Sequence, residues 1–436
     1  MRLTSTRDKS VNSSFANAIL NCMPKDGGLY VPDGTADLRR WILYTNENTS
    51  FSSIAGALTS AFINNEYSPL ICETIATKAF PFEPVLKQLD DRLFALELFH
   101  GPTCCSRDFG VSYLINTLET TLHYEGKNAI LLDYTSGEHG TILSHSLRGK
   151  KHLKSILIYQ KGKTFGLKDE DFIWNGGNIY PVEFDGDKEA CHKLIKEIFE
   201  DSAFVQKNNI TVSTTANIGR LIPQTFSFTY AFSRLKNKVS SDIYYALDPD
   251  NYGNLVAGLY SWKLSLPVSG FILPSTPELA SDAIGNAVIT DSFIPVEQRE
   301  TADASDPSNT ERLEDFFSHY APMMSSFVHT TEVSKKETED AEKELFVKYK
   351  RYSDYHTAKA YAAALKNQGL IDEEGGAIVL VDRFHPAFSA SYIEKVIGDK
   401  IEIPEEIAAI KKPFTIGKPV ITSKDELVKI IEAFAE

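Results

Sequence analysis

The sequence predicts an α/β fold from three features of its pattern. Short apolar runs of strand length alternate with stretches of helical periodicity. Glycine and polar residues follow several of these runs, as expected where a strand turns into a helix. No internal repeat or low-complexity segment interrupts the pattern over the 436 residues, a length that suits two or three domains.

The N-terminal part of the chain is predicted to form a separate structural layer. The first 80 residues or so are helical and loop-rich in pattern and lack the strand-turn-helix rhythm. Strands are then predicted at 129–133, 155–159 and 178–184, the last at a sheet edge because Pro181 cannot donate to a ladder. Residues 188–204 read as one amphipathic helix.

Two further strands and a capped helix are predicted in the second half. Residues 243–247 form an apolar run that leads into a polar turn and a helix. Residues 376–381 are rich in branched aliphatic side chains, which is typical of a buried parallel strand. The final helix is expected to begin at Ser423, with Glu426 completing a capping box.

Three predicted strand-to-helix turns carry polar and glycine residues, at Thr135, Asp250 and Asp382. Ligands bind at the carboxyl ends of strands in open parallel sheets. A site assembled from these three turns is therefore expected. The alternative is that the turns are only short connections.

Composition excludes several classes of partner. The formal charge of −14 argues against nucleic acid, which needs a clustered positive surface. No run approaches the roughly 20 apolar residues of a membrane span, and the first residues lack the apolar core of a secretory signal. The five cysteines show no metal spacing or disulfide framework, so no metal site and a reduced, cytoplasmic location are expected.

Eight segments, in order along the chain, resemble the signatures of the threonine synthase family. They are Ser5-Thr6-Arg7, DGGLYVP at 26–32, LELFHGPTCCSRDFG at 96–110, TSGEHG at 135–140, NIGR at 217–220, DNYGNLVAG at 250–258, SDPSN at 305–309 and FHPA at 384–387. The resemblance implies the fold of the tryptophan synthase β-subunit group, in which doubly wound α/β lobes enclose a pyridoxal-phosphate cleft. It suggests an N-terminal helical domain at 1–95, a small lobe at 96–235, and a large lobe with the C-terminal helices at 236–436.

Arg107 stands where the family has the lysine that holds pyridoxal phosphate as a Schiff base. A guanidinium keeps its proton at physiological pH and cannot attack an aldehyde as a neutral amine. No catalytic residue is therefore assigned, and no bound cofactor is expected. Lys161 and Lys163 are the alternative amines if the local alignment is wrong.

Three other departures from the family pattern lie at positions that, in the family, surround the same cofactor. Asp250 replaces the first glycine of the phosphate loop, and its charge repels a phosphate by a few kcal/mol at an effective dielectric near ~20. Arg383 replaces the threonine that faces the pyridine nitrogen in the family, and Glu138 and His139 enlarge the 135–140 turn. Their convergence favours natural divergence over a single engineered change.

The resemblance implies two groups of site residues, and the cofactor group is degenerate here. The cofactor positions are Asp250, Asn251, Tyr252, Gly253, Asn254 and Arg383, and the substrate positions are Thr135, Ser136, Gly137, Asn217 and Arg220. Asn217 and Arg220 correspond to positions that bind the substrate phosphate in the family, and the alternative is that they form a helix start. His100 is expected to be a structural hydrogen-bonding residue rather than a base.

Two functions from different classes follow. One is a pseudoenzyme that binds a small anion in the old cleft or an active paralogue. The other is threonine synthase itself, converting O-phosphohomoserine to threonine and phosphate in amino-acid biosynthesis, or a changed lyase activity in the same cleft. The arginines of the cleft are expected either to plug it through internal ion pairs, or to face an open anion site. The sequence leaves the oligomeric state open.

Overall fold

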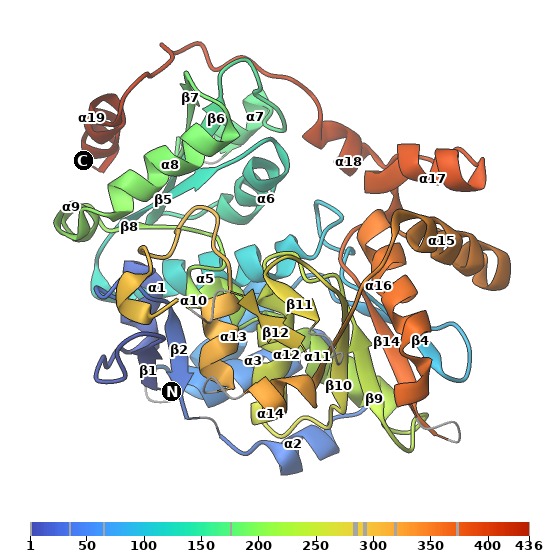
Figure 1. The fold of residues 1–436 in the computed structure, drawn as a ribbon. Helices are drawn as coiled ribbons and strands as arrows, with labels where there is room; N and C mark the ends of the chain where they lie inside the picture. Colours follow the sequence, from blue (N-terminus) through green and yellow to red (C-terminus); the bar gives the residue numbers. More distant parts are fainter. Residues whose placement is uncertain are drawn as a thin grey trace.

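The computed structural model describes residues 2–34, 36–63, 66–174, 177–281, 287–290, 294–317, 321–371 and 375–435. Two parallel sheets lie in separate lobes, with helices packed around both (Figure 1). This is the predicted two-lobed α/β architecture. Among the described residues, no helix is both long enough and apolar enough to cross a membrane.

The small lobe is built on a parallel sheet of four strands in the order β7-β6-β5-β8. The strands are β5 (Ala129–Tyr134), β6 (Leu153–Gln160), β7 (Ile179–Phe184) and β8 (Ile210–Thr211). The three predicted strands of this region are confirmed, and β7 lies at the edge, as Pro181 required.

The helix predicted over residues 188–204 is two helices. The chain forms α8 (Lys188–Phe199) and α9 (Ser202–Lys207), with a break at Glu200 and Asp201. The side chain of Asp201 accepts a hydrogen bond from the backbone of Phe204, so it caps a new helix where the apolar periodicity alone continued the old one. The other helices around this lobe are α5 (Arg107–Glu125), α6 (Glu138–Leu147), α7 (Asp169–Trp174) and α10 (Ile218–Leu221).

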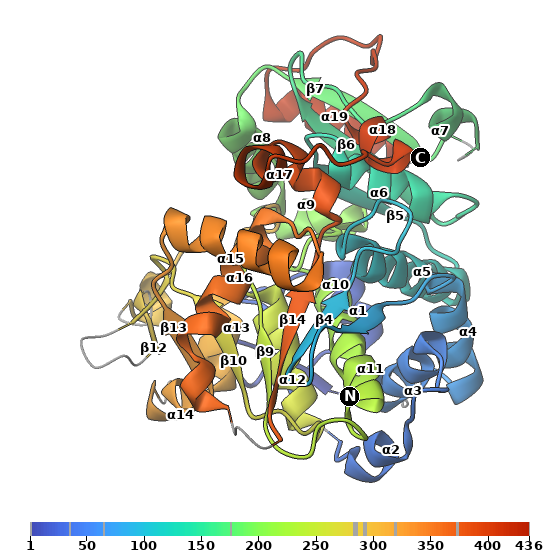
Figure 2. The ribbon, with the colours of Figure 1, turned by 90° about the vertical axis from the view of Figure 1, so that its right-hand side faces the viewer.

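The large lobe is built on a six-stranded sheet in the order β13-β10-β9-β14-β4-β3 (Figure 2). The strands are β3 (Val85–Gln88), β4 (Leu93–Glu97), β9 (Ile243–Ala246), β10 (Gly270–Pro274), β13 (Val328–Thr331) and β14 (Ala377–Asp382), and all pairs are parallel except β3 with β4. The two strands predicted here, β9 and β14, are confirmed. A small hairpin adds β11 (Leu279–Ser281) and β12 (Ala287–Ile289).

Helices cover the large sheet and join it to the rest of the chain. They are α11 (Gln224–Leu235), α12 (Gly253–Lys263), α13 (Thr310–Phe316), α14 (Ala321–Ser325), α15 (Lys335–Tyr349), α16 (Tyr355–Lys366) and α17 (Ala390–Ile397). The aromatic residues of α11, including Phe226 and Phe228, are buried, as predicted for core packing.

The N-terminal layer is helical, as predicted, and contains one strand pair that the sequence did not reveal. Its helices are α1 (Phe15–Asn21), α2 (Arg39–Tyr44), α3 (Phe51–Ile63) and α4 (Pro69–Ala79). The strands β1 (Arg2–Ser5) and β2 (Tyr30–Asp33) pair antiparallel across 24 intervening residues, so no local turn signal announces them.

The C-terminal segment crosses from the large lobe back to the small one. It runs through α18 (Glu405–Ile410), forms bridges from Pro413 to Phe165 and from Ile421 to Phe184, and ends in α19 (Lys424–Ala435) beside α8 (Figure 1). α19 begins directly after Ser423, as predicted, and the Glu426 carboxylate accepts from the backbone of Thr422.

The division at residues 95/96 and 235/236 stays a prediction. The strands and helices are nevertheless distributed differently from those boundaries. β3 and most of β4 precede residue 96 but belong to the large sheet, and α19 packs on the small lobe. The cause is β-sheet pairing: β4 is hydrogen-bonded along its whole length to β14, about 280 residues later.

Arg312 joins three parts of the chain from a position that is fully buried. Its guanidinium donates to the carbonyl oxygens of Tyr30, Thr215 and Ala216 and to the side chain of Asn309. Burial lowers the pKa of Arg312 to about 10, because no carboxylate accepts a hydrogen bond from it among the described residues. Oxygen dipoles alone compensate this charge.

Candidate functional site

A cavity of about 270 Å³ lies between the lobes, where the predicted turns meet. Thr135 and Ser136 after β5, Asp250 and Asn251 after β9, and Arg383 after β14 all line it. The expected convergence of three strand-to-helix turns is thus present. The third turn contributes Arg383 rather than Asp382, whose carboxylate is buried against Arg351.

Arg107 is the first residue of α5 and faces Glu138, the first residue of α6. Its Nη1 donates to Oε1 of Glu138 at 3.0 Å, while 37% of the arginine side chain stays accessible from the cavity. Burial by itself lowers the pKa of Arg107, but Glu138 more than offsets this and the pKa is raised. The group is a permanent cation.

Arg383 and Asp250 form a second ion pair across neighbouring strands β14 and β9. The charge of Arg383 lowers the pKa of Asp250 to about 2, so this carboxylate is ionised at neutral pH. The ring of Phe384 lies between the two arginines, 5.3 Å from the Arg383 guanidinium and 5.9 Å from that of Arg107. The two ion pairs therefore form one network.

Arg220 is the third arginine of the cavity, and it has no partner. The residue is only 7% exposed, and its guanidinium makes no hydrogen bond or ion pair with any part of the chain that the structure describes. Burial lowers the pKa of Arg220 to about 10, and repulsion by Arg107 and Arg383 contributes. At neutral pH it is still a cation, and a buried unpaired cation is costly.

Gly110 makes room for Arg220. A β-carbon built on this glycine of α5 would lie 1.9 Å from Nη1 of Arg220. Any other residue at this position has to displace the guanidinium.

Side chains accept from several N–H groups of the turns at 135–140 and 250–254. The hydroxyl of Thr135 accepts from the backbones of Gly137 and Gly140, and Oδ1 of Asn251 accepts from Gly253. The carboxylate of Asp248 accepts from the backbone of Asp250. An anion at either turn would have to displace these bonds.

Four of the predicted site residues do not line the cavity. Tyr252 is buried and its hydroxyl contacts Thr276 and Glu278, while Gly253 opens α12 behind it. Gly137 packs against the carbonyl of Ile410. Asn217 is fully buried as the N-cap of α10, accepting from Gly219 and donating to Ile19, so its role is the helix start.

His139 and several residues that sequence reasoning missed complete the lining. Nε2 of His139 lies 2.7 Å from Oγ of Ser213, and Ser213 in turn donates to Asp133. This is not a nucleophilic triad, because the carboxylate binds the serine instead of orienting the imidazole. Gln224, Ser227, Thr214, Thr215, His192, Lys188 and Ser305 also line the cavity; alternation of polar and aromatic residues along α11 was the one available signal.

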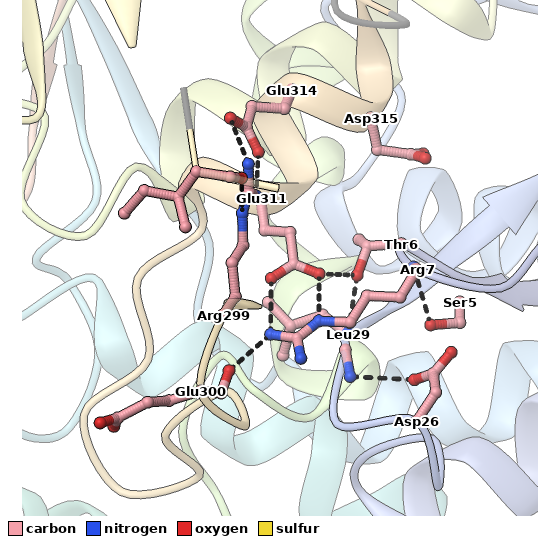
Figure 3. Close-up of polar contacts among 12 residues, drawn as sticks. Ser5, Thr6, Arg7, Asp26, Leu29, Arg299, Glu300, Glu311, Glu314 and Asp315 are labelled. Atoms are coloured by element: carbon pink, nitrogen blue, oxygen red, sulfur yellow. Dashed lines mark hydrogen bonds and ion pairs between the residues drawn. The ribbon is translucent and has the colours of Figure 1, made fainter. Parts of the chain in front are cut away.

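Residues 305–307 form part of one wall of the cavity, and the flanking residues Glu300 and Glu311 are held by the N-terminal motif (Figure 3). Arg7 donates to both carboxylate oxygens of Glu311 and, through Nη2, to the carbonyl of Glu300 at 2.7 Å. The hydroxyl of Thr6 also donates to Glu311. On the inner side, Ser305 contacts His192 at 2.6 Å, so the wall is fixed on both faces.

The alternative amines do not reach this site. Neither Lys161 nor Lys163 is among the lining residues, and Lys161 pairs with Asp185 on the surface. Lys188 is the one lysine of the lining, at the exposed start of α8 beside Asp306. No group of metal-ligating side chains occurs within the described parts of the chain.

The residues present do not fit pyridoxal phosphate. The paired guanidinium of Arg107 stands where the family has the amine. Side chains accept from several N–H groups of the 135–140 and 250–254 turns, and Asp250 adds a fixed negative charge there. Arg383 is committed to that carboxylate.

Comparisons with known proteins agree on one family. Residues 2–80 match the family model described as threonine synthase N terminus. The chain is 28% identical to threonine synthase from Serratia marcescens over 413 residues and to that from Escherichia coli over 414, covering 94% of each chain. The crystal structure of the E. coli threonine synthase matches with a TM-score of 0.78 and 26% identity, covering 99% of this chain and 100% of that one. A threonine synthase from Brucella melitensis, described as bound to pyridoxal phosphate, has the same fold, with a TM-score of 0.78 at 19% identity over the whole of both chains.

Proposed function

Because the chain belongs to the threonine synthase family, we propose that it is a member without pyridoxal-phosphate chemistry that binds a small anion in the cavity between its lobes. The observation that carries the first half of the proposal is the ion pair between Arg107 and Glu138. It places a committed cation at the position where the family chemistry needs an amine.

The anion half of the proposal rests on Arg220. The two ion pairs of the cavity neutralise Arg107 and Arg383, so Arg220 is the arginine of the lining without an ion pair among the described residues. Asp108 acts on its charge, but burial raises the pKa of this carboxyl to about 7. An oxyanion that accepts two N–H groups from a guanidinium satisfies both its charge and its donors. The paired Arg107 and Arg383 thus support the predicted plugged cleft, and Arg220 supports the predicted anion site.

Isothermal titration calorimetry with inorganic phosphate tests the anion site. Wild-type protein is expected to bind, and Arg220→Met to lose at least about tenfold in affinity. Arg40→Met is the matched control, since Arg40 is exposed on α2 and far from the lining residues. Absence of phosphate binding by the wild type, or equal binding by Arg220→Met, contradicts the proposal.

Threonine synthase activity is the second candidate, supported by the alignment with curated threonine synthases over 94% of the chain. The two candidate functions differ in whether pyridoxal phosphate forms a covalent bond with a lysine of the chain. After incubation with pyridoxal phosphate and borohydride, mass spectrometry is expected to find no cofactor on any lysine, Lys188 included. A stoichiometric adduct, together with phosphate release from O-phosphohomoserine, favours the enzyme.

The cytoplasmic location remains part of the proposal. All five cysteines are free thiols, which suits a reducing compartment. An active paralogue as a partner also stays a prediction.

A further inference from the structure

We infer that the ligand of the cavity is an oxyanion whose tail carries hydroxyl or amide groups and no ammonium group. This inference rests on the proposed anion site and specifies the class of its ligand. It separates this chain from a binder of phosphorylated amino acids. Three features of the lining support it: the balance of charges, the uncommitted neutral groups beside Arg220, and the positions of the carboxylates.

The balance of charges in the interior is positive. Arg107, Arg220 and Arg383 are close enough that each of the other two lowers the pKa of Arg220. Glu138 and Asp250 are the carboxylates facing them. Burial raises the pKa of Asp108, a third carboxylate close to Arg220, to about 7. Below that pH, three cations against two anions leave one positive charge for a ligand to neutralise.

Neutral hydrogen-bonding groups surround Arg220 and are not used by the protein. Gln224 lies one helical turn further on, and its amide nitrogen reaches only the carbonyl of Arg220, at 3.5 Å. The hydroxyl of Ser227 on α11 and the amide of Asn254 on α12 line the cavity without a hydrogen bond to any described residue. Such groups pair with hydroxyl, carbonyl or amide atoms of a ligand.

The interior carboxylates that could receive an ammonium group already pair with arginines, each through one oxygen. Oε1 of Glu138 accepts from Arg107, and Oδ2 of Asp250 accepts from Arg383. Asp306 is exposed at the rim, beside Lys188 and His192. An ammonium group inside would therefore have to share a carboxylate with an arginine, and it would lose its water while facing three arginines.

The test compares ligands that share a phosphate and differ in one group. Binding of inorganic phosphate, glycerol 3-phosphate, O-phosphoethanolamine and its N-acetyl derivative is measured by calorimetry at pH 6, where Asp108 is mostly protonated. We expect glycerol 3-phosphate and the N-acetyl derivative to bind at least as tightly as phosphate, and O-phosphoethanolamine to bind about tenfold more weakly. Asp425→Asn should leave this order unchanged, because Asp425 is exposed on α19 and lies outside the lining.

The outcomes separate the two proposals. If phosphate binds and O-phosphoethanolamine binds as tightly as its acetylated derivative, the ligand class is wrong while the anion site stands. If no phosphate compound binds, or if Arg220→Met binds all of them as the wild type does, the anion site itself is wrong. Loss of every affinity in Arg220→Met, with the expected order in the wild type, supports both.

Discussion

Ser106 donates its backbone N–H to the carbonyl oxygen of Arg383 at 2.7 Å. This bond ties the start of α5 to the end of β14, and a second one, from the backbone of His385 to the carbonyl of Cys104 at 3.1 Å, reinforces it. The turns that carry Arg107 and Arg383 therefore hold each other in place. Arg107 and Arg383 thus belong to one connected network and are not two independent side chains.

Arg107→Lys is expected to restore neither a cofactor adduct nor threonine formation. The new ammonium would pair with Glu138, and both Asp250 and Arg383 would remain. Borohydride trapping with mass spectrometry, and a threonine assay, check this. An adduct on residue 107 would show that the remaining departures are tolerated.

Glu138→Gln is expected to tighten phosphate binding by about five- to tenfold. The substitution removes the partner of Arg107 and gives the cavity a second unpaired guanidinium. Titration at low ionic strength measures the change, and added salt should reduce it. Unchanged affinity would mean that Arg107 lies too far from the bound phosphate to influence its binding.

Gly110→Ala is expected to weaken phosphate binding about as much as loss of Arg220 itself, because the added methyl group occupies the position of Nη1. The methionine side chain in Arg220→Met is shorter than that of arginine. Gly110→Ala should therefore lower the free energy of unfolding less in that variant than in the wild type. Chemical denaturation of the two single variants and the double variant gives the coupling. Additive free energies of unfolding would contradict the contact.

Glu342→Gln is expected to stabilise the protein above pH 7. Burial raises the pKa of Glu342 to about 7, although Ser353 donates to it. The stability that comes from the protonated carboxyl is complete below the unfolded pKa of 4.5 and is lost as the pH rises through about 7. Urea titrations from pH 5 to 8 should show a variant advantage that grows to about 1–3 kcal/mol; a constant difference contradicts the assignment.

Arg7→Met is expected to loosen the segment 300–309. It removes the ion pair of the mostly buried Glu311 carboxylate, which then keeps the hydrogen bond from Thr6. It also removes the hydrogen bond to the carbonyl of Glu300 (Figure 3). Hydrogen exchange in that segment should accelerate, with phosphate affinity falling about threefold. Lys9→Met is the control, because the Lys9–Asp315 pair is more exposed and contributes little.

The sequence predicts the elements that a local pattern of apolar and turn residues determines. β5, β9 and β14 are apolar runs with a turn at their carboxyl ends, and parallel pairing then brings the Asp250 and Arg383 turns together. The break at Asp201 was missed because a cap residue outweighed continuing periodicity. The role of Asn217 and the isolation of Arg220 depend on which groups surround them in three dimensions, and no sequence pattern carries that information.

The carbonyl cage of Arg312 also has a consequence for how the chain unfolds. The four oxygens come from the N-terminal layer, from the turn before α10 and from the start of α13. If any one of these segments detached, a buried charge would be left without its solvating dipoles, at a cost of about 3–5 kcal/mol. Partial opening at this junction is thereby disfavoured, and the two lobes and the N-terminal layer should melt in a single cooperative transition.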